Sequence, residues 1–566
     1  MLEIYRKGVM KLTQYSRLTH VLSHSGVPRP IWRWRVFIGC CALLSPAGYM
    51  HFKQHMGRPE GQPAQAVVDT ATGVVALRNA GVEAFERTLP DFVWDGGILT
   101  DELTHPLHGI RRISDLPVDA DTSNSVMPSH DIWRRLNSKD VRIVPERQVV
   151  TGGDNMREAN LDRGYLKLQA ARAVLSTAIG QIATATSAET DPAVGKAFRG
   201  ELYALLGYTE VMLADLFCSG VPLNTYTLSP TLANEILDMG NAVGQQIAIK
   251  TVFDSLVANR TIAYHPSSTT TQVYWAALAK FDTALSLAGD STRILNLARV
   301  GKGRVWLALG QYDSAAAAVA RVPQGFVYRL PLDINLDGDW EEVEATVADR
   351  EGGNGLPYIS SGDPRTETEW ISTDKVIRQV RVPSKYLQGG DLLEGFQRDP
   401  TTIEIAFALE SGHKTASGVI APFTAVSWEE AVLIRAEAAL HKQPADPTWL
   451  RLLNQLRATA PIPGTTRPNP ARLVPLKDPG TKRGRISMLF AERAYWLFLT
   501  GHRQGDLRRL VRQYRWPQQQ VYPTGSYIVP QGLVGQVGQY GTDVNLPIPP
   551  EERANPNFHG CLDRGA

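Results

Sequence analysis

Near its C-terminus the chain reads Glu492-Arg493-Ala494-Tyr495-Trp496-Leu497-Phe498-Leu499-Thr500-Gly501-His502-Arg503-Gln504-Gly505-Asp506-Leu507-Arg508-Arg509. Apolar residues recur there at helical spacings, at Met488, Leu489, Tyr495, Phe498 and Leu499. Gly501 follows them and, having no Cβ, can end the helix in the left-handed conformation that other residues avoid. The stretch therefore predicts a core helix and its cap. Such a helix supports a scaffold and performs no chemistry of its own.

Length and composition predict a large folded protein. A chain of 566 residues suffices for two to four ordinary domains, or for one large helical-repeat body with an inserted lobe. The apolar fraction of 43% is typical of globular proteins, and the charged fraction of 20% argues against wholesale disorder. Fifty-nine basic and 57 acidic residues leave a formal net charge of +2, which gives no overall attraction to nucleic acid or to an anionic membrane.

The N-terminus predicts export. Arg33 and Arg35 precede a mostly apolar run, residues 36–50. This run is too short for a membrane-spanning helix, which needs about 20 apolar residues, but it fits the apolar region of a secretory leader. Within it, Phe37-Ile38-Gly39-Cys40 looks like a lipobox, in which Cys40 becomes the acylated anchor of a lipoprotein. The alternatives are a leader that is uncleaved or cleaved elsewhere, or a start site placed too far upstream.

Beyond the leader the chain has two cysteines, Cys218 and Cys561. In an oxidising compartment such a pair can form a disulfide between the middle of the chain and its C-terminus. Closing so long a loop would contribute about 4 to 5 kcal/mol in the chain-entropy model. The alternative is two unrelated buried thiols, because sequence does not supply the short Cα separation that a bridge requires.

Internal repetition predicts the architecture. The spacing of a tetratricopeptide repeat, a helical hairpin with small residues at its closest approach, recurs at Gly303, Trp306, Gly310, Tyr312 and Ala315. Its first part recurs at Gly200, Tyr203 and Gly207, and a weaker copy at Ala436, Ala439 and Gln443, followed by a helix through Trp449, Leu450, Leu453 and Leu456. We therefore expect a mostly α-helical, tetratricopeptide-like scaffold.

Periodicity and composition divide the chain further. Helices are expected at residues 161–182, 198–217, 273–287, 296–309, 314–320 and 488–499. We expect six segments: a leader (1–50), an N-terminal loop-rich segment with helices (51–160), a helical-repeat region (161–324), a loop-rich inserted lobe (325–424), a C-terminal helical region (425–512) and an extended tail packed on the body (513–566).

Short landmarks along the chain carry a family resemblance. They are Ala76-Leu77-Arg78-Asn79, Gly97-Ile98-Leu99-Thr100-Asp101-Glu102, Phe217-Cys218-Ser219-Gly220-Val221-Pro222-Leu223, Glu351-Gly352-Gly353-Asn354-Gly355-Leu356-Pro357, Asp363-Pro364-Arg365, Tyr522-Pro523-Thr524-Gly525, Tyr540-Gly541-Thr542-Asp543-Val544-Asn545, Leu546-Pro547-Ile548-Pro549 and Asn555-Pro556-Asn557. Together with residues 492–509, and in this order, they resemble the SusD/RagB family of outer-membrane nutrient-binding lipoproteins. Most of them are turn sequences, and their ordered accumulation makes the resemblance specific.

The resemblance implies a function without a reaction. Proteins of this family sit over a TonB-dependent transporter of the SusC type, capture an oligosaccharide or peptide, and deliver it to the channel. The expected location is the cell outer membrane, held by the lipid anchor, surface-exposed or facing the periplasm.

The search for catalytic chemistry agrees with a binding protein. The chain has no H-E-x-x-H, G-x-S-x-G or G-x-x-x-x-G-K-[ST] motif, and its twelve histidines form no cluster with metal-ligand spacing. His502 is interpreted as a structural side chain near a helix C-terminus, where a cation is favourable. A glycosidase needs only two carboxylates at the right separation, so sequence leaves an enzyme as an alternative.

One acidic run has the spacing of a calcium loop. Residues 333–344 match D-x-[DN]-x-[DN]-G-x5-E, with candidate ligands Asp333, Asn335, Asp337, Asp339 and Glu344. A solvated acidic turn is the alternative. No cofactor is required by the predicted function, and calcium is the one that the sequence suggests.

Exposed aromatic rings are the side chains expected to stack on sugars. The candidates in loop-like contexts are Trp94, Trp133, Trp340, Trp370, Tyr386 and Trp516, each with packing as the alternative role. The predicted function is capture of an oligosaccharide or other nutrient for a SusC-like transporter. A helical-repeat adaptor for protein partners and an exported glycoside-active enzyme are the alternatives.

Overall fold

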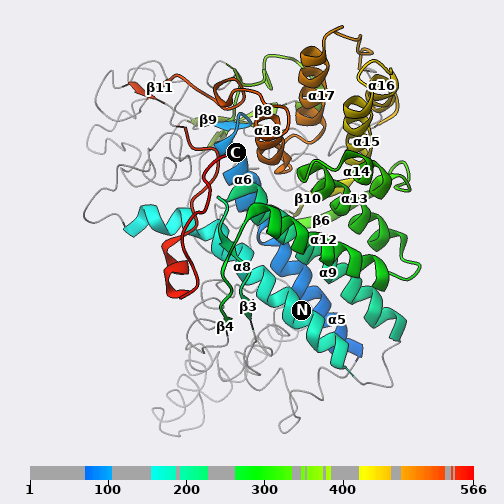
Figure 1. The fold of residues 1–566 in the computed structure, drawn as a ribbon, viewed down its shortest axis with the longest axis vertical. Coiled ribbons are helices and arrows are strands. Elements are labelled where there is room, and N and C mark those ends of the chain that lie inside the picture. The colour runs from blue at the N-terminus through cyan, green and yellow to red at the C-terminus, as the bar shows by residue number, and fades with distance from the viewer. Residues whose placement is uncertain are drawn as a thin grey trace, which may run out of the picture. The chain divides into compact units, whose positions relative to one another are not determined.

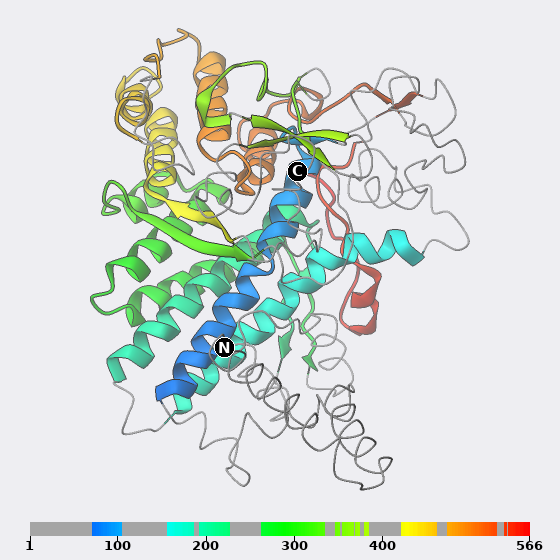
Figure 2. The same ribbon diagram turned by 180° about the vertical axis from the view of Figure 1, so that it is seen from behind.

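The computed structural model describes residues 71–104, 155–185, 192–226, 262–333, 346–350, 354–366, 368–373, 378–383, 420–460, 473–528, 537–539 and 542–566. The chain divides into two compact units, Met1–Val67 and Val68–Ala566, and all of these residues lie in the second. This unit is mostly helical, as predicted (Figures 1 and 2). Its helices are α5 (Ala71–Glu86), α6 (Leu89–Leu99), α8 (Asn155–Thr184), α9 (Pro192–Leu216), α12 (Thr270–Leu287), α13 (Thr292–Ala308), α14 (Tyr312–Val319), α15 (Trp428–Lys442), α16 (Thr448–Thr459), α17 (Lys482–Trp496) and α18 (His502–Arg512).

The helices pack side by side in an order that largely follows the chain. Helix α5 lies along α8, and α9 contacts both α8 and α12; the series continues through α13, α14, α15 and α16 (Figure 2). Large side chains such as Tyr165, Phe281 and Trp449 are fully buried between these helices. Each additional pair thus buries its apolar face against the pair before it, which is how helical repeats build one continuous core.

The repeat spacing correctly predicts the hairpin of α13 and α14. A Cβ on Gly303 would lie 2.5 Å from a side-chain carbon of Val319, so only glycine permits this approach of the two helices. Gly310 has a φ of +72° and forms the turn between the helices. The Tyr312 ring stacks on the His441 ring of α15, with 3.7 Å between the ring centroids. The repeat residues therefore hold α13 against α14 and connect this hairpin to α15.

The other two predicted copies also lie in packed helices. Gly200 and Gly207 face α12, where a Cβ would meet the backbone oxygen of Ala284 at 3.2 Å and the ring of Phe281 at 3.0 Å. The third copy forms the hairpin of α15 and α16, and Trp449 anchors the second helix with 1% of its surface exposed.

The segment containing residues 488–509 differs from the prediction of one helix ended by Gly501. Helix α17 ends at Trp496, and Leu499 has a φ of +48° in the turn that follows. Gly501 does adopt the left-handed conformation, with a φ of +79°, but it begins a second helix, α18, rather than ending the first. The prediction missed α18 because its buried residues are mainly charged, and hydrophobic periodicity does not mark such a helix.

Pairs of short antiparallel strands link the helices, and the described strands form six such pairs. The longest pair joins β6 (Val327–Asp333) to β10 (Ile420–Ser427), with a register shift between Thr424 and Val426. The remaining pairs are β1 (Leu103–Thr104) with β7 (Thr346–Val347), β2 (Val221–Pro222) with β5 (Ser267–Ser268), β3 (Thr225–Tyr226) with β4 (Ile262–Ala263), β8 (Thr368–Thr373) with β9 (Arg378–Pro383), and β11 (Ser526–Ile528) with β12 (Val537–Gln539).

The C-terminal residues are bonded to the end of α9. Cys218 and Cys561 form a disulfide, with their Cα atoms 5.7 Å apart. Backbone hydrogen bonds run beside it: the N–H of Cys218 donates to Leu546, and the N–H of Ser219 donates to Asp563. A disulfide and a bonded backbone thus connect the tail to the middle of the chain across a separation of 343 residues.

Candidate functional site

The structure describes one of the predicted ligand-binding aromatic side chains in detail. Trp133, Trp340 and Tyr386 lie outside the described residues. Trp94 falls in α6 and Trp370 in β8, while their side chains also lie outside what is described.

Trp516, the remaining candidate, follows α18 and is partly buried against the core. The guanidinium carbon of Arg483, in α17, lies 4.4 Å from the centroid of its ring. Arg483 also donates a hydrogen bond to the side chain of Gln520. A cation therefore covers one face of the Trp516 ring, which leaves less of the ring for a sugar than its loop position suggested.

Most of the predicted calcium ligands and the lipid anchor are not described. Asp333 is the last residue of β6, and its side chain lies outside the described set together with Asn335, Asp337, Asp339, Glu344 and Cys40. Among the described residues, no group of three or more His, Cys, Asp or Glu side chains is placed to hold a metal ion. None of the described helices is both long enough and apolar enough to cross a membrane.

The described surface offers one exposed tryptophan that the sequence reasoning missed. Trp275 of α12 is 52% exposed and meets Trp306 of α13 edge to face, with 5.4 Å between ring centroids. Trp275 was passed over because it lies within a helical apolar pattern, and Trp306 because it occupies a repeat position. The signal available was one tryptophan on each of two helices predicted next to each other in the chain, at residues 273–287 and 296–309.

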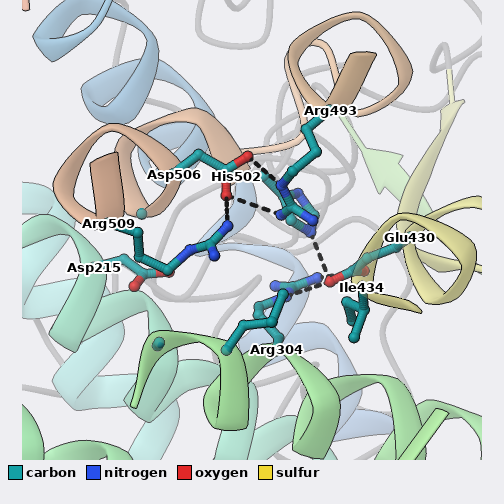
Figure 3. Close-up of a pocket in the computed structure, with 11 residues that line it drawn as sticks. Asp215, Arg304, Glu430, Ile434, Arg493, His502, Asp506 and Arg509 are labelled. Carbon is teal, nitrogen blue, oxygen red and sulfur yellow. Dashed lines mark hydrogen bonds and ion pairs between the residues drawn. The ribbon is translucent and has the colours of Figure 1, made fainter. Parts of the chain in front are cut away.

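The segment 492–509 forms part of a buried cluster of charges, here called the signature joint (Figure 3). Its buried members are Asp215 of α9, Glu430 and Glu437 of α15, Arg493 of α17, and His502, Asp506 and Arg509 of α18, and the half-buried Arg304 of α13 joins them; Figure 3 labels all but Glu437. Five helices thus contribute charged side chains to one interior region.

Asp506 is the centre of one half of the signature joint. Arg493 donates to both of its carboxylate oxygens, with Nε and Nη2 at 2.7 and 2.9 Å, and Arg509 donates to Oδ1 from 2.8 Å. Burial alone would raise the pKa of the Asp506 carboxyl, but the charges of Arg493 and Arg509 outweigh it and hold that pKa well below its usual range. Arg509 also donates to Glu437, which ties α18 to α15.

Glu430 is the centre of the other half. Arg304 donates to it through Nε and Nη2, at 2.7 and 2.9 Å, and the His502 Nε2 atom lies 3.1 Å from its Oε1. Burial opposes ionisation of this carboxyl, yet Arg304 and His502 lower the pKa of Glu430 to about 2. Burial, and then the charge of Arg304, lowers the pKa of the His502 imidazole.

His502 was predicted to be a structural side chain near a helix C-terminus, where a cation is favourable, and the structure places it at a helix N-terminus instead. It is the first residue of α18, it is buried, and its environment favours the neutral imidazole. Its Nδ1 atom lies 2.7 Å from the Thr500 hydroxyl. The Thr500 hydroxyl itself donates to the backbone oxygen of Leu497 at 2.5 Å, which fixes this turn beside the imidazole.

The cavity inside the signature joint has room for little more than water. Its volume of about 20 Å³ corresponds to about one water molecule. Glu430 and Asp506 are committed to arginine partners, and the Asp215 carboxylate accepts from the Tyr274 hydroxyl at 2.5 Å. The joint therefore connects helices and leaves no space for a sugar or peptide.

The sequence landmarks meet next to this joint although they are far apart in the chain. Arg503 donates to the two carboxylate oxygens of Asp101 at 2.6 and 2.7 Å across 402 residues. Glu102, the next residue, accepts from the backbone N–H of Leu499 at 3.0 Å, and the N–H of Leu356 donates to Asp101 at 2.9 Å. Three separate landmarks are thereby joined at one place.

Two further landmarks make the same kind of contact. Arg365, from Asp363-Pro364-Arg365, donates to Glu492 at 2.7 and 3.1 Å, and Arg457 donates to the same carboxylate at 2.6 Å. The amide nitrogen of Gln504 donates to the backbone oxygen of Val544 at 2.5 Å. The turn sequences of the landmarks therefore supply partners for the charged and polar side chains of residues 492–509.

Comparisons with known proteins found matches among solved structures alone. No protein-family model and no curated protein matches the chain. Among solved structures, the chain resembles a SusD superfamily protein from Bacteroides vulgatus, with 14% identity over 86% of this chain and 98% of that one and a TM-score of 0.48. It also resembles NanU of B. fragilis, with 12% identity over 89% and 99% of the two chains and a TM-score of 0.47. A SusD superfamily protein from Bacteroides thetaiotaomicron matches at 13% identity over 88% and 98%, with a TM-score of 0.46.

Proposed function

We propose that this protein captures an oligosaccharide or another nutrient at the outer membrane and delivers it to a SusC-like TonB-dependent transporter without catalysing a reaction. The observation that carries the proposal is the convergence of the landmarks. Asp101, Glu102 and Leu356 contact Arg503 or its neighbours, and Arg365 contacts Glu492. Short motifs that matched a family by chance would have no reason to bond to one another across hundreds of residues.

The buried carboxylates support a binding role over the alternative of a glycoside-active enzyme. A glycosidase needs one carboxyl that holds a proton and a second that faces the sugar ring. In the signature joint, arginine neighbours keep Glu430 and Asp506 ionised, and the cavity between them is too small for a sugar. These residues therefore favour a scaffold that binds without turnover.

The exposed tryptophan pair supports a saccharide as the cargo. Trp275 and Trp306 lie edge to face on adjacent helices, and Trp275 leaves about half of its surface to solvent. Flat aromatic faces stack on the C–H side of sugar rings and lose little conformational entropy on binding. We infer that this pair is a stacking surface within the described part of the molecule.

Binding and turnover can be measured in one experiment. The exported protein is titrated by calorimetry with a panel of oligosaccharides and peptides, and each mixture is then analysed by mass spectrometry for shortened products. Saturable binding with intact ligand supports capture, whereas product formation would establish the enzyme. Trp275→Ala should weaken saccharide binding, while Trp516→Ala, whose ring is covered by Arg483, serves as the matched aromatic control.

Delivery requires its own test. Affinity purification of the tagged protein from detergent-solubilised outer membranes should recover a β-barrel transporter encoded beside it. Recovery of soluble envelope proteins in its place would favour the alternative of a helical-repeat adaptor.

The lipid anchor and the calcium loop are proposals with direct tests. Metabolic labelling with a fatty acid should mark the wild type and Cys41→Ser, and Cys40→Ser should abolish the label. Calcium should raise the thermal midpoint of the wild type and leave that of Asp337→Ala unchanged. An identical response of both proteins would refute calcium binding by this loop.

A further inference from the structure

A pocket of about 240 Å³ lies beside the signature joint, between α12, the end of α13, and α18. Three arginines of α18 line it, Arg508, Arg509 and Arg512. Thr271 and Tyr274 of α12 contribute hydroxyl groups. The volume is close to the lower end of the range for small-molecule sites, about 300 Å³, and far above that of the water-sized cavity next to it.

The arginines of this pocket differ in how their charge is balanced. Arg509 is paired with Glu437 and Asp506. Arg508 is buried, with 4% of its surface exposed, and its Nη1 donates to the backbone oxygens of Ala214, Asp215 and Phe217 at 2.6, 3.0 and 3.3 Å. These acceptors are neutral carbonyls at the C-terminal end of α9. Among the described residues, Arg508 therefore has no carboxylate within ion-pair distance.

Arg512 is exposed at the pocket and has neither a hydrogen bond nor an ion pair among the described residues. It lies four residues after Arg508, so the two cations share one face of α18 and repel each other. Burial and then this repulsion lower the pKa of the Arg512 guanidinium, against weaker opposing effects of Tyr274 and Asp563. Two cations thus face one cavity, and neither makes an ion pair within the described part of the chain.

The acidic groups around the pocket are engaged elsewhere. No carboxylate lines it. Asp215 lies behind its wall, where the Tyr274 hydroxyl donates to it at 2.5 Å. Glu437 and Asp506 lie on the far side of Arg509, in the signature joint. The side chains that line the cavity itself therefore carry only positive charge.

We propose that this pocket binds the oxyanion group, carboxylate or phosphate, of one small organic molecule, with Arg508 and Arg512 as its cations. A guanidinium presents a planar set of N–H donors that matches both groups, and a partly desolvated site strengthens the attraction. The Thr271 hydroxyl at the rim adds a neutral donor for the rest of the molecule. This inference goes beyond the proposed capture of oligosaccharides and does not depend on it.

Three compounds with one sugar frame test the charge requirement. Glucose, glucuronate and glucose 6-phosphate are titrated into the full exported protein by calorimetry in 20 mM and 300 mM salt. We expect saturable binding of at least one anion, none of glucose, and a weaker affinity at the higher salt concentration. The preferred anion identifies the oxyanion as carboxylate or phosphate.

Matched arginine variants locate the site. Arg512→Gln should weaken binding of the preferred anion about tenfold, which is the usual effect of one charge-assisted hydrogen bond. Arg435→Gln, an exposed change of the same kind on α15 outside the pocket, should leave the affinity unchanged. Because Arg512 makes no hydrogen bond among the described residues, its variant should keep the wild-type thermal midpoint.

Several results would overturn the proposal. They are the absence of saturable binding by both anions, equal binding of glucose, or equal weakening by Arg435→Gln and Arg512→Gln. Capture of a neutral oligosaccharide should be the same in Arg512→Gln and in wild type. A failed anion site and a failed capture function are therefore distinguishable.

Discussion

Replacing Arg503 with alanine should destabilise the protein, because it leaves the buried carboxylate of Asp101 without its cationic partner. Its guanidinium makes two parallel hydrogen bonds to Asp101, at 2.6 and 2.7 Å, and the two side chains are 7% and 1% exposed. The variant leaves the Asp101 carboxylate buried with neutral donors alone: the N–H of Leu356, its own backbone N–H and the distant Tyr358 hydroxyl. Breaking a buried pair in this way costs about 3–5 kcal/mol, mainly because the remaining charge is uncompensated.

The expected shift in thermal midpoint follows from the size of the unit. Unfolding entropy of about 2 cal/mol/K per residue gives about 1 kcal/mol/K for a unit of about 500 residues. A loss of about 4 kcal/mol therefore lowers the midpoint by about 4 °C. Differential scanning calorimetry measures it, with Arg485→Ala as the control, because Arg485 makes an equally two-pronged pair with the exposed Asp478 and only one further bond, to the backbone oxygen of Pro444. That control should shift the midpoint by less than about 1 °C.

A double variant separates charge burial from lost packing. Asp101→Asn combined with Arg503→Gln removes both charges and should recover much of the loss seen in Arg503→Ala, since neither side chain then leaves a buried ion. An Arg503→Ala shift no larger than that of Arg485→Ala would refute the reasoning. The reasoning would also be refuted if the double variant lost as much stability as Asp101→Asn and Arg503→Gln lose together when each is made alone.

Three further predictions concern the same body. Reduction of Cys218–Cys561, or replacement of both cysteines by serine, should cost up to about 5 kcal/mol and lower the calorimetric midpoint. Gly501→Ala should lower the free energy of unfolding in urea by about 2–4 kcal/mol, because φ is +79° and the new Cβ would lie 2.0 Å from the Phe92 ring of α6. Gly525→Ala, at φ +94° with open space around it, should lower it by the smaller backbone contribution alone. The lowered pKa of Glu430 should add about 3 kcal/mol to the free energy of unfolding. This contribution is fully present above the unfolded pKa of about 4.5 and is lost as the pH falls to the folded pKa of about 2. In Glu430→Gln the free energy of unfolding should therefore depend less on pH between 4.5 and 2, as measured by urea denaturation.

The sequence predicted the parts of the fold that follow from apolar spacing. The hairpin of α13 and α14 was expected at residues 296–309 and 314–320 and lies at 292–308 and 312–319. Helix α18 was not expected, because Arg503, Asp506 and Arg509 look like a solvated surface in a linear pattern. They are buried only because their partners, such as Asp101 and Glu437, arrive from distant segments. Long-range charge pairing has no signature in one sequence.

The candidate sites show the same limit. Loop context selected Trp516, whose ring face is covered by Arg483, and helical context concealed Trp275, which is half exposed. The exposed fraction of a side chain depends on which neighbours pack against its helix. The spacing of apolar residues in the sequence does not show how much of the helix surface those neighbours cover. The arginine pocket was equally hidden, since Arg508 was seen only as part of residues 492–509 and Arg512 lies beyond that stretch.

Charges in the signature joint give the helices one permitted register. Apolar helices can slide past one another and still bury most of their surface, so their alignment is weakly specified. If α18 shifted by one turn, Asp506 would leave Arg493 of α17 and Arg509 would leave Glu437 of α15, so buried charges of both signs would lose partners at once. The penalty for each misaligned state is several kcal/mol, even where the net stabilisation by the correct pairs is small. A joint of paired charges thus holds its helices in one alignment. We therefore expect Asp506→Asn to broaden the calorimetric transition as well as lower its midpoint, whereas an apolar core truncation of equal cost, such as Leu453→Ala in α16, should lower the midpoint and leave the transition width unchanged.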